Sequence, residues 1–321
     1  MKASTIATIA ISAVSALAAP TKTLGKRAAI TDSPDIGFAT QNGGTTGGAG
    51  GSTTTVSSLA QFTEAAEADG AAVIVVSGAI DGGAKVRVAS DKTIVGADSS
   101  AVLTNVGLYI NKVKNVIVRN LTIKEVLAEN GDAIGIQASE NVWIDHCDLS
   151  SNQDHGKDYY DGLLDVTHGS DYVTLSNNYI HDHYKASLVG HSDSNGDEDT
   201  GHLTVTYYKN YFENLNSRGP SYRFGTGHVL NNFYSGVSDG INTRQGAQLL
   251  VEGNVFVDAK KPLYSTDAGY AVATDNDFGD AENTAEEGTI SASDLGYTYT
   301  ALASSEVKAA VVGTAGATLT F

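Results

Sequence analysis

Short runs of alternating apolar and polar residues recur along most of this chain, and turn-forming residues separate them. The clearest runs read VIVRN, VWIDH, YVTLSNN, LTVTYYKN, HVLNN and LLVEGN. Runs of β-forming residues bounded by Gly, Asn, Asp and Ser are typical of strands. The pattern therefore predicts many short strands and very little helix.

Asparagines give these strands a period. Four of them open similar triplets (NYF, NFY, NVF, NDF) at intervals of 22 residues, at Asn210, Asn232, Asn254 and Asn276. Related triplets begin upstream at Asn178 and Asn120, after longer and unequal gaps. A period near 22 residues with strands and hardly any helix predicts a β-solenoid, in which each coil stacks on the last.

Stacked asparagines suit such a coil. Asparagine tolerates left-handed backbone and bonds locally, and amides at one corner can bond from coil to coil. With strands about 4.8 Å apart, seven or eight coils would form a cylinder about 35 Å long. A β-sandwich with fortuitous spacing is the alternative, but few sandwiches would hold one interval three times.

The two ends of the periodic region differ from its middle. Residues 57–70 (SSLAQFTEAAEADG) predict a short capping helix with Ser57 or Ser58 as its N-cap. Such a helix would cover the open end of the solenoid. From Asp280 onward the period is lost, and we expect this segment to pack along the outside of a single domain spanning residues 28–321.

Residues 1–19 predict a secretory signal peptide, because a lysine precedes a short run of apolar and small residues. Residues 20–27 end in a Lys-Arg pair and predict a propeptide, with an ordinary basic pair in a flexible tail as the alternative. No later segment is apolar and long enough to cross a bilayer. We therefore expect a secreted, extracellular product.

The charge balance limits the partners. The chain has 37 acidic and 20 basic residues, a formal net charge of −17. Such a body repels nucleic acid and anionic membranes, and an anionic substrate would need an intervening cation. Cys147 is the only cysteine, so no intramolecular disulfide can form. Its apolar surroundings favour a buried, inert thiol.

Three aspartates are candidate metal ligands. Asp132 begins a strand-like run, and Asp161 and Asp165 lie in an inserted region before the next strand. A spacing of four places the latter two on one face of either a helix or a strand. Converging carboxylates suit Ca²⁺, which takes ~6 to 8 oxygen ligands. Three ordinary turn aspartates are the alternative.

Basic residues follow the acidic ones. Arg218 and Arg223 flank Pro220 in the segment RGPSYRFG, and Lys185 lies between that segment and the aspartates. Guanidinium groups hold carboxylates in a planar fork, so an anion clamp is one interpretation and a pair of structural arginines is the other. Asp145 and His146 are interpreted as structural, because neighbours on a strand point to opposite faces.

Several motifs resemble, in order, those of a known family. The runs ENGDAI, NVWIDHCDLS, DGLLDVTHGSDYVTLSNNYIHDHYKASLVGHSD and NSRGPSYRFG look like the pectate lyases of the right-handed parallel β-helix class, whose family also contains the pectin lyases. The run GFATQNGGTTGGAGG resembles the fungal branch. The resemblance covers about Gly37 to Lys261 and implies an all-β, right-handed parallel β-helix.

The resemblance also implies an activity. It implies calcium-dependent, endo-type cleavage of demethylated polygalacturonate (pectate) by β-elimination, giving 4,5-unsaturated oligogalacturonides in plant cell-wall pectin degradation, by a monomer. It implies that Ca²⁺ is held by Asp132, Asp161 and Asp165, that substrate carboxylates bind Lys185 and Arg223, and that the proton-abstracting base is Arg218. Because arginine is normally protonated, a base role implies a high working pH.

Two local features qualify the resemblance. Asn130, beside Glu129, stands where some relatives have a further aspartate for an additional, substrate-bridged calcium. Asn120 begins a glycosylation sequon inside the strand pattern, where a buried corner asparagine is favoured.

Three rival functions stay open. Pectin lyases act on methylated polymer, lose the calcium acids and line their cleft with tryptophans, whereas Trp143 is the only Trp here. A polygalacturonase would carry Asn-Thr-Asp, paired Asp and Gly-His-Gly motifs, which this sequence lacks. A non-catalytic carbohydrate-binding protein would be favoured by loss of Arg218 or of a calcium acid, and neither is lost.

Overall fold

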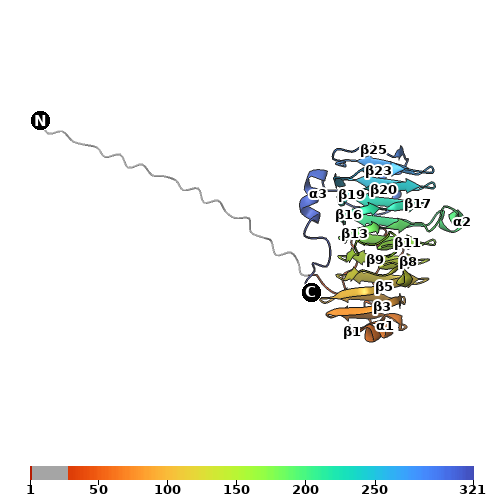
Figure 1. Ribbon diagram of the computed structural model, residues 1–321, viewed down its shortest axis with the longest axis vertical. Helices are drawn as coiled ribbons and strands as arrows, with labels where there is room; N and C mark the ends of the chain where they lie inside the picture. The colour runs from red at the N-terminus through yellow and green to blue at the C-terminus, as the bar shows by residue number, and fades with distance from the viewer. Residues whose placement is uncertain (2–27) are drawn as a thin grey trace.

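Each turn of the chain stacks on the previous one, so that strands from successive coils pair in parallel along a cylinder (Figure 1). The computed structural model describes Met1 and residues 28–321. The expected signal peptide beyond Met1 and the expected propeptide lie outside the described residues. Within that described part, no helix has the length and hydrophobicity to cross a membrane.

One face of the cylinder is a sheet of eleven parallel strands. Its strands are β1 (Ser52–Val56), β2 (Ala72–Val76), β4 (Lys92–Gly96), β6 (Lys114–Arg119), β9 (Glu140–Asp145), β12 (Asp171–Ser176), β15 (Thr204–Tyr208), β18 (Thr226–Leu230), β21 (Gln248–Glu252), β24 (Tyr270–Thr274) and β26 (Glu286–Glu287).

The other two faces form one folded sheet. Its two arms join at β5 (Val102–Asn111), which also pairs with β3 (Ala79–Val88). The first arm holds β7 (Thr122–Lys124), β10 (Asp148–Ser150), β13 (Tyr179–Lys185), β16 (Tyr211–Ser217), β19 (Phe233–Val237) and β22 (Val255–Val257). The second arm holds β8 (Ile134–Gln137), β11 (Leu164–Thr167), β14 (Leu188–Val189), β17 (Ser221–Arg223), β20 (Asp239–Arg244), β23 (Lys261–Ser265) and β25 (Asn283–Thr284).

The right-handed parallel β-helix is confirmed, but the expected seven or eight coils are too few. The long sheet has eleven strands, so about eleven coils stack. The earliest coils carry no asparagine-led triplet, and the triplet at Asn120 begins one residue before the ladder position. The position that precedes the first arm holds Ala101 and Leu121 in two of those coils and Cys147 in a third.

The predicted asparagine ladder is present and buried. The side-chain Nδ2 of Asn210 donates to Oδ1 of Asn232 at 3.0 Å, and Asn232 donates to Asn254 in the same way at 2.9 Å. The ladder extends back to Asn178 and on to Asn276. Each Oδ1 also accepts from the backbone N–H of the preceding coil. The period therefore comes from amides that satisfy one another where no water reaches.

Asn120 is buried as expected, but it is not part of the ladder. Leu121 occupies the ladder position, and Asn120 lies one residue earlier with φ of 56°. The equivalent residue in later coils is also left-handed, as at Asn177 (52°) and Asn231 (54°). Asparagine is favoured there because it adopts this conformation more readily than most residues.

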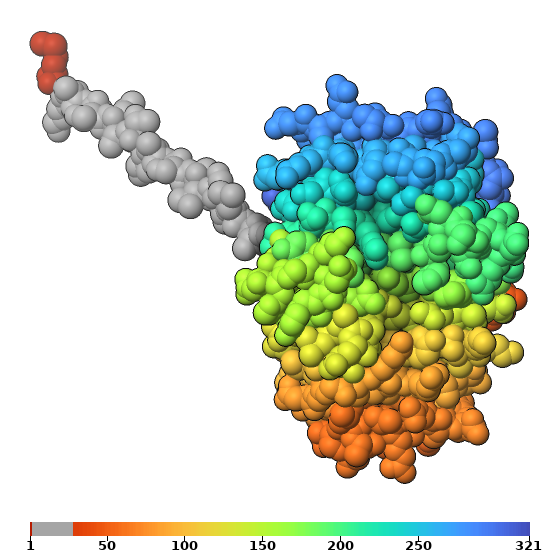
Figure 2. All heavy atoms as spheres, turned by 45° about the vertical axis from the view of Figure 1, so that its right-hand side comes forward, coloured from red at the N-terminus to blue at the C-terminus, as the bar shows by residue number. Residues whose placement is uncertain are grey.

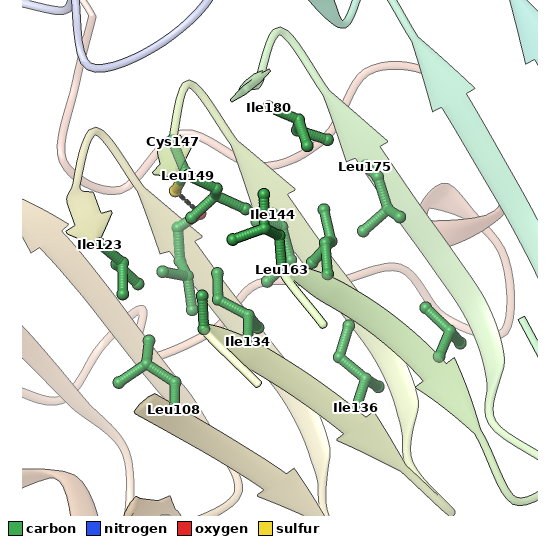
Figure 3. Close-up of a cluster of buried hydrophobic side chains, with 14 of the residues drawn as sticks. Leu108, Ile123, Ile134, Ile136, Ile144, Cys147, Leu149, Leu163, Leu175 and Ile180 are labelled. Carbon is green, nitrogen blue, oxygen red and sulfur yellow. Dashed lines mark hydrogen bonds between the residues drawn. The ribbon is translucent and has the colours of Figure 1, made fainter. Parts of the chain in front are cut away.

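Inward-facing side chains from all three faces form one continuous apolar core (Figure 3). Rings stack along part of it, with centroids 4.7 Å apart between Phe212 and Tyr234 and 4.2 Å between Tyr234 and Phe256. Cys147 is fully buried in this core, and burial raises the pKa of its thiol to about 12. The inert thiol is therefore confirmed.

The predicted helix closes the N-terminal end. Helix α1 (Leu59–Glu67) begins after Ser58, whose hydroxyl accepts from the Gln61 N–H, and buries Phe62 against the first strands. The glycine-rich segment before it packs flat on the long sheet. A Cβ on Gly48 would lie 1.9 Å from the Ala72 carbonyl oxygen, so only glycine fits there.

The C-terminal segment descends along the outside of the cylinder, as predicted (Figure 1). Helix α3 (Ser304–Val311) packs against β19 and β22. Asn231 exchanges two hydrogen bonds with the backbone of Leu302, and Asn120 does the same with Leu319. The remaining short helices are η1 (Phe38–Thr40), η2 (Ala128–Asn130), α2 (Gly196–Asp199) and η3 (Ala292–Asp294).

Removing one rung of the ladder should destabilise the fold. Asn232→Ala leaves the backbone N–H and the side-chain amide of Asn210 without their acceptor. Each buried unsatisfied donor costs about 1–3 kcal/mol, so we expect urea unfolding to show a loss of about 2–5 kcal/mol. The exposed Asn216→Ala is the control, with an expected change of about 0.5 kcal/mol or less. Equal losses in the two variants would contradict a structural role for the ladder.

Candidate active site

The predicted acids and Arg218 meet at the turn between the two arms. Here the chain leaves a first-arm strand and enters the second arm, and two coils carry longer loops before β8 and β11. A cavity of about 290 Å³ opens at this turn. Segments near residues 150–160 (yellow-green) and 190–200 (green) stand out on either side of a hollow (Figure 2). The cavity is lined by Asp132, Gly135, Gln137, Asp161, Asp165, Thr167, Leu188, His191 and Arg218.

Asp132, which is half-buried, and Asp165, which is buried, are the two inner acids of this cavity. Asp132 accepts from the Gly162 N–H at 2.9 Å, and Asp165, only 7% exposed, accepts from the Leu188 N–H at 2.9 Å. Asp165 lies on β11, not before the strand as expected. Burial, with the neighbouring charge of Asp161, raises the pKa of Asp132 to about 6. Burial and the charge of Asp132 raise the pKa of Asp165 well above its usual value.

Asp161 lies at the same cavity but turns to a cation of the protein. Its carboxylate is 3.2 Å from Nζ of Lys185, which also lies 3.2 Å from Asp158. The Asp161 side chain is 47% exposed, so it is the most accessible of the three acids. Lys185 ends β13 and pairs in register with Ser217, which places it beside Arg218.

His183 fixes the loop that carries Asp161. Its Nε2 is 2.6 Å from the Asp161 carbonyl oxygen and its Nδ1 is 2.5 Å from the Ser151 hydroxyl. A carbonyl only accepts, so Nε2 carries the proton and Nδ1 accepts from the hydroxyl. Burial lowers the pKa of His183 to about 4, so it stays neutral. These contacts give His183 a structural role, because it ties both ends of the loop.

Arg218 enters the cavity from a special backbone position. Its φ is 65°, and the Gly219–Pro220 bond that follows is cis. Its carbonyl accepts from the Ser187 N–H at 2.8 Å, and Gly219 donates to the Gly240 carbonyl at 2.9 Å. Among the described residues, the Arg218 guanidinium makes no ion pair or hydrogen bond. Its charge lowers the pKa of both Asp132 and Asp165, against the effect of burial.

Arg223 lies beyond the cavity rim and is paired. Its Nε is 2.5 Å from Asp193, and its Nη1 donates to the Gly190 carbonyl at 3.1 Å. Asp193 also binds Arg244, which is the register partner of Arg223 on the next coil. The arginines are therefore held by a carboxylate of the 190–200 segment.

The donor set of the cavity fits a hard cation. Three carboxylates converge there, and burial disfavours the charge of two of them. In the described part of the chain, however, no group of three His, Cys, Asp or Glu side chains is arranged to hold a metal ion. Asp161 would have to turn from Lys185 toward the two inner acids to complete a set of oxygen ligands.

Sequence reasoning missed part of this site and misjudged one pair. Gln137, Thr167 and His191 line the cavity but carry no motif that singles them out. Asp145 and His146 do not point to opposite faces, because His146 Nδ1 lies 2.8 Å from Asp145. His146 has φ of 50°, so the alternation of a strand ends there. Asp145 is nonetheless structural, being buried against Arg119.

Comparisons with known proteins agree on one family. A family profile described as pectate lyase matches residues 2–319. Probable pectate lyase A of Aspergillus flavus is 67% identical over 307 residues, covering 95% of each chain. Pectate lyase A of Aspergillus niger is 65% identical over 308 residues, covering 95% of this chain and 94% of that one. A solved pectate lyase from Bacillus sp. N165, in complex with trigalacturonate, superposes with a TM-score of 0.78 at 30% identity, covering 88% of this chain and 98% of that one.

The two inner acids should destabilise the cation-free protein at neutral pH. The folded-state pKa of Asp132 is raised to about 6. The folded protein is therefore more stable while Asp132 is protonated. This contribution to stability is fully present below about pH 4 and is lost as the pH rises through about 6. We expect Asp132→Asn, in excess chelator, to raise the free energy of unfolding by about 1–3 kcal/mol near pH 7 and to give no gain near pH 4. Asp280→Asn, at an exposed position, is the control. The same change at both pH values would contradict the effect of burial.

Proposed function

This chain belongs to the pectate lyase family and is a pectate lyase, and from this premise we propose that it cleaves demethylated polygalacturonate by calcium-dependent β-elimination. The observation that carries the proposal is that three carboxylates and Arg218 line one cavity. We further propose endo-type cutting, release of 4,5-unsaturated oligogalacturonides and a role in plant cell-wall pectin degradation.

Asp132, Asp161 and Asp165 would hold the calcium ion, whose charge, when bound, stabilises the substrate carboxylate as negative charge grows on it. The raised pKa of Asp132 and Asp165 supports this assignment, because two acids whose charges burial disfavours gain most from a cation. Asn130 donates from its side-chain Nδ2 to Oδ1 of Asn105 at 3.0 Å, and its neutral amide supplies no negative charge for an additional calcium.

Arg218 is proposed to take the C5 proton of the galacturonate residue. That proton lies α to the carboxylate, so its removal is eased by charge delocalisation. The C5–H electron pair becomes the C4=C5 double bond as the C4–O bond breaks, and the leaving oxygen takes a proton from water. The guanidinium must be neutral to act, so activity is expected at high pH.

Lys185 and Arg223 are proposed to bind substrate carboxylates. Both already hold carboxylates of the protein, Asp161 and Asp193 respectively. Substrate carboxylates would replace these partners, which frees Asp161 to turn toward the calcium ion and leaves Asp193 paired with Arg244. An acidic protein can thereby bind a polyanion.

Several expectations about the whole chain become part of the proposal. We propose that residues 1–19 direct secretion, that residues 20–27 are removed, and that residues 28–321 act extracellularly as a single-domain monomer. The identity of the Aspergillus relatives across 95% of the chain supports a shared organisation.

The decisive measurement is ultraviolet absorbance with polygalacturonate. Elimination leaves a conjugated C4=C5 double bond, so absorbance should rise with calcium and the rise should disappear in excess chelator. New reducing ends without absorbance would instead show hydrolysis. Faster cleavage of highly methylated polymer, unaffected by chelator, would support a pectin lyase.

Replacing the proposed base should stop turnover without disturbing the site. Arg218→Lys keeps a positive charge but replaces the planar guanidinium with a compact ammonium. We expect the rate to fall by at least about 10³-fold, in the range typical of general bases, while calcium still raises the melting temperature as it does in the wild type. Activity close to that of the wild type would remove Arg218 from the base role.

A further inference from the structure

An aromatic pair stands at the rim of the cavity, on the loop that carries Asp161. Tyr159 is 46% exposed, one of few large apolar side chains so exposed among the described residues. Its ring stacks on that of His155, with centroids 3.9 Å apart and an interplanar angle of 25°. The exposed part of the ring is available to a ligand, which would gain free energy by covering it.

The outer face of Tyr159 is open. Tyr160 meets Tyr159 edge-on, with centroids 4.9 Å apart, and lies 6.1 Å from His155. The three ring centroids form a triangle with sides of 3.9, 4.9 and 6.1 Å, and its angle at Tyr159 is close to a right angle. His155 therefore covers one face of the ring and Tyr160 lies at its edge. The opposite face is covered by neither.

The pair is fixed in place next to the site. Tyr160 forms an antiparallel bridge with Leu127, and the Ala128 N–H donates to the Tyr159 carbonyl at 3.1 Å. One residue, Tyr160, separates Tyr159 from Asp161, so their Cα atoms are at most roughly 7 Å apart. Asp158, the residue directly before Tyr159, binds Lys185. The backbone of Tyr159 is thus held next to Asp158, the residue that binds the proposed substrate-binding lysine.

We propose that Tyr159, backed by His155, is a stacking platform for a galacturonate residue outside the reacting bond, an inference that rests on the proposed function. In a galacturonate ring the axial C4 oxygen leaves the hydrogens of C3, C4 and C5 on one apolar face. The electron-rich face of tyrosine attracts such hydrogens. The contact needs no ion pair, so the platform takes methyl-esterified and free residues alike.

Binding measured without turnover tests the platform. In gels containing polygalacturonate, retardation of the full chain gives a dissociation constant, and Tyr159→Ala should raise it roughly 2- to 10-fold. Tyr159→Phe should bind like the wild type, because the ring and not the hydroxyl makes the contact. Val312→Ala, at a remote exposed apolar position, is the matched control and should change nothing.

Salt separates stacking from an indirect effect. If the loss comes from stacking, the ratio of the dissociation constants of Tyr159→Ala and the wild type stays the same from low to high salt. An effect exerted through the charges of Asp158 and Lys185 is screened by salt. A ratio that disappears at high salt, or a Tyr159→Ala protein that binds as tightly as the wild type, would overturn the platform. Wild-type binding without any absorbance rise would overturn the proposed elimination and leave the platform standing. Absence of wild-type binding would overturn both.

Discussion

Buried amides fix the height and rotation at which the coils from Asn178 to Asn276 stack on one another. From Asn210 onward, each ladder Oδ1 accepts from both the backbone and the side chain of the preceding coil, so a shift by one residue would leave two donors unpaired for each rung. The left-handed residue just before the ladder then sets the direction in which the chain enters the first arm. The two coils with long loops, before β8 and β11, hold Leu121 and Cys147 at the ladder position, so the amide ladder begins one coil beyond the loops that form the active site.

Electrostatics dominates the site that the scaffold presents. Burial works against the charges of Asp132 and Asp165, while Arg218 works in their favour. The other cations are already matched: Lys185 with Asp158 and Asp161, and Arg223 with Asp193. Lys185 and Arg223 are therefore already paired within the protein, whereas the charges of Asp132 and Asp165 are opposed by burial.

More of the fold than of the site could be predicted from the sequence. The 22-residue interval predicted the ladder because amide pairing demands one residue type at one position. The early coils could not be predicted in this way, since apolar Ala101 and Leu121 can fill that position where hydrogen bonding is not required. At the site, charge alone brought the three aspartates into consideration, but the pairing of Asp161 with Lys185 depends on the path of an aperiodic loop. No period predicts that path. The left-handed conformation of His146 likewise depends on the corner and not on its own residue type.

The clasp between the tail and the cylinder bears on how the chain comes to be folded. Ladder partners lie 22 residues apart in the later coils, so each coil can form soon after it is synthesised. Leu319, by contrast, bonds to Asn120 across 199 residues. Closing so long a loop is slow and entropically costly, and the tail can dock only on coils that already exist. Docking of the tail is thus a late event that requires the coils to be in place. It distinguishes chains that have finished folding from those that stopped partway.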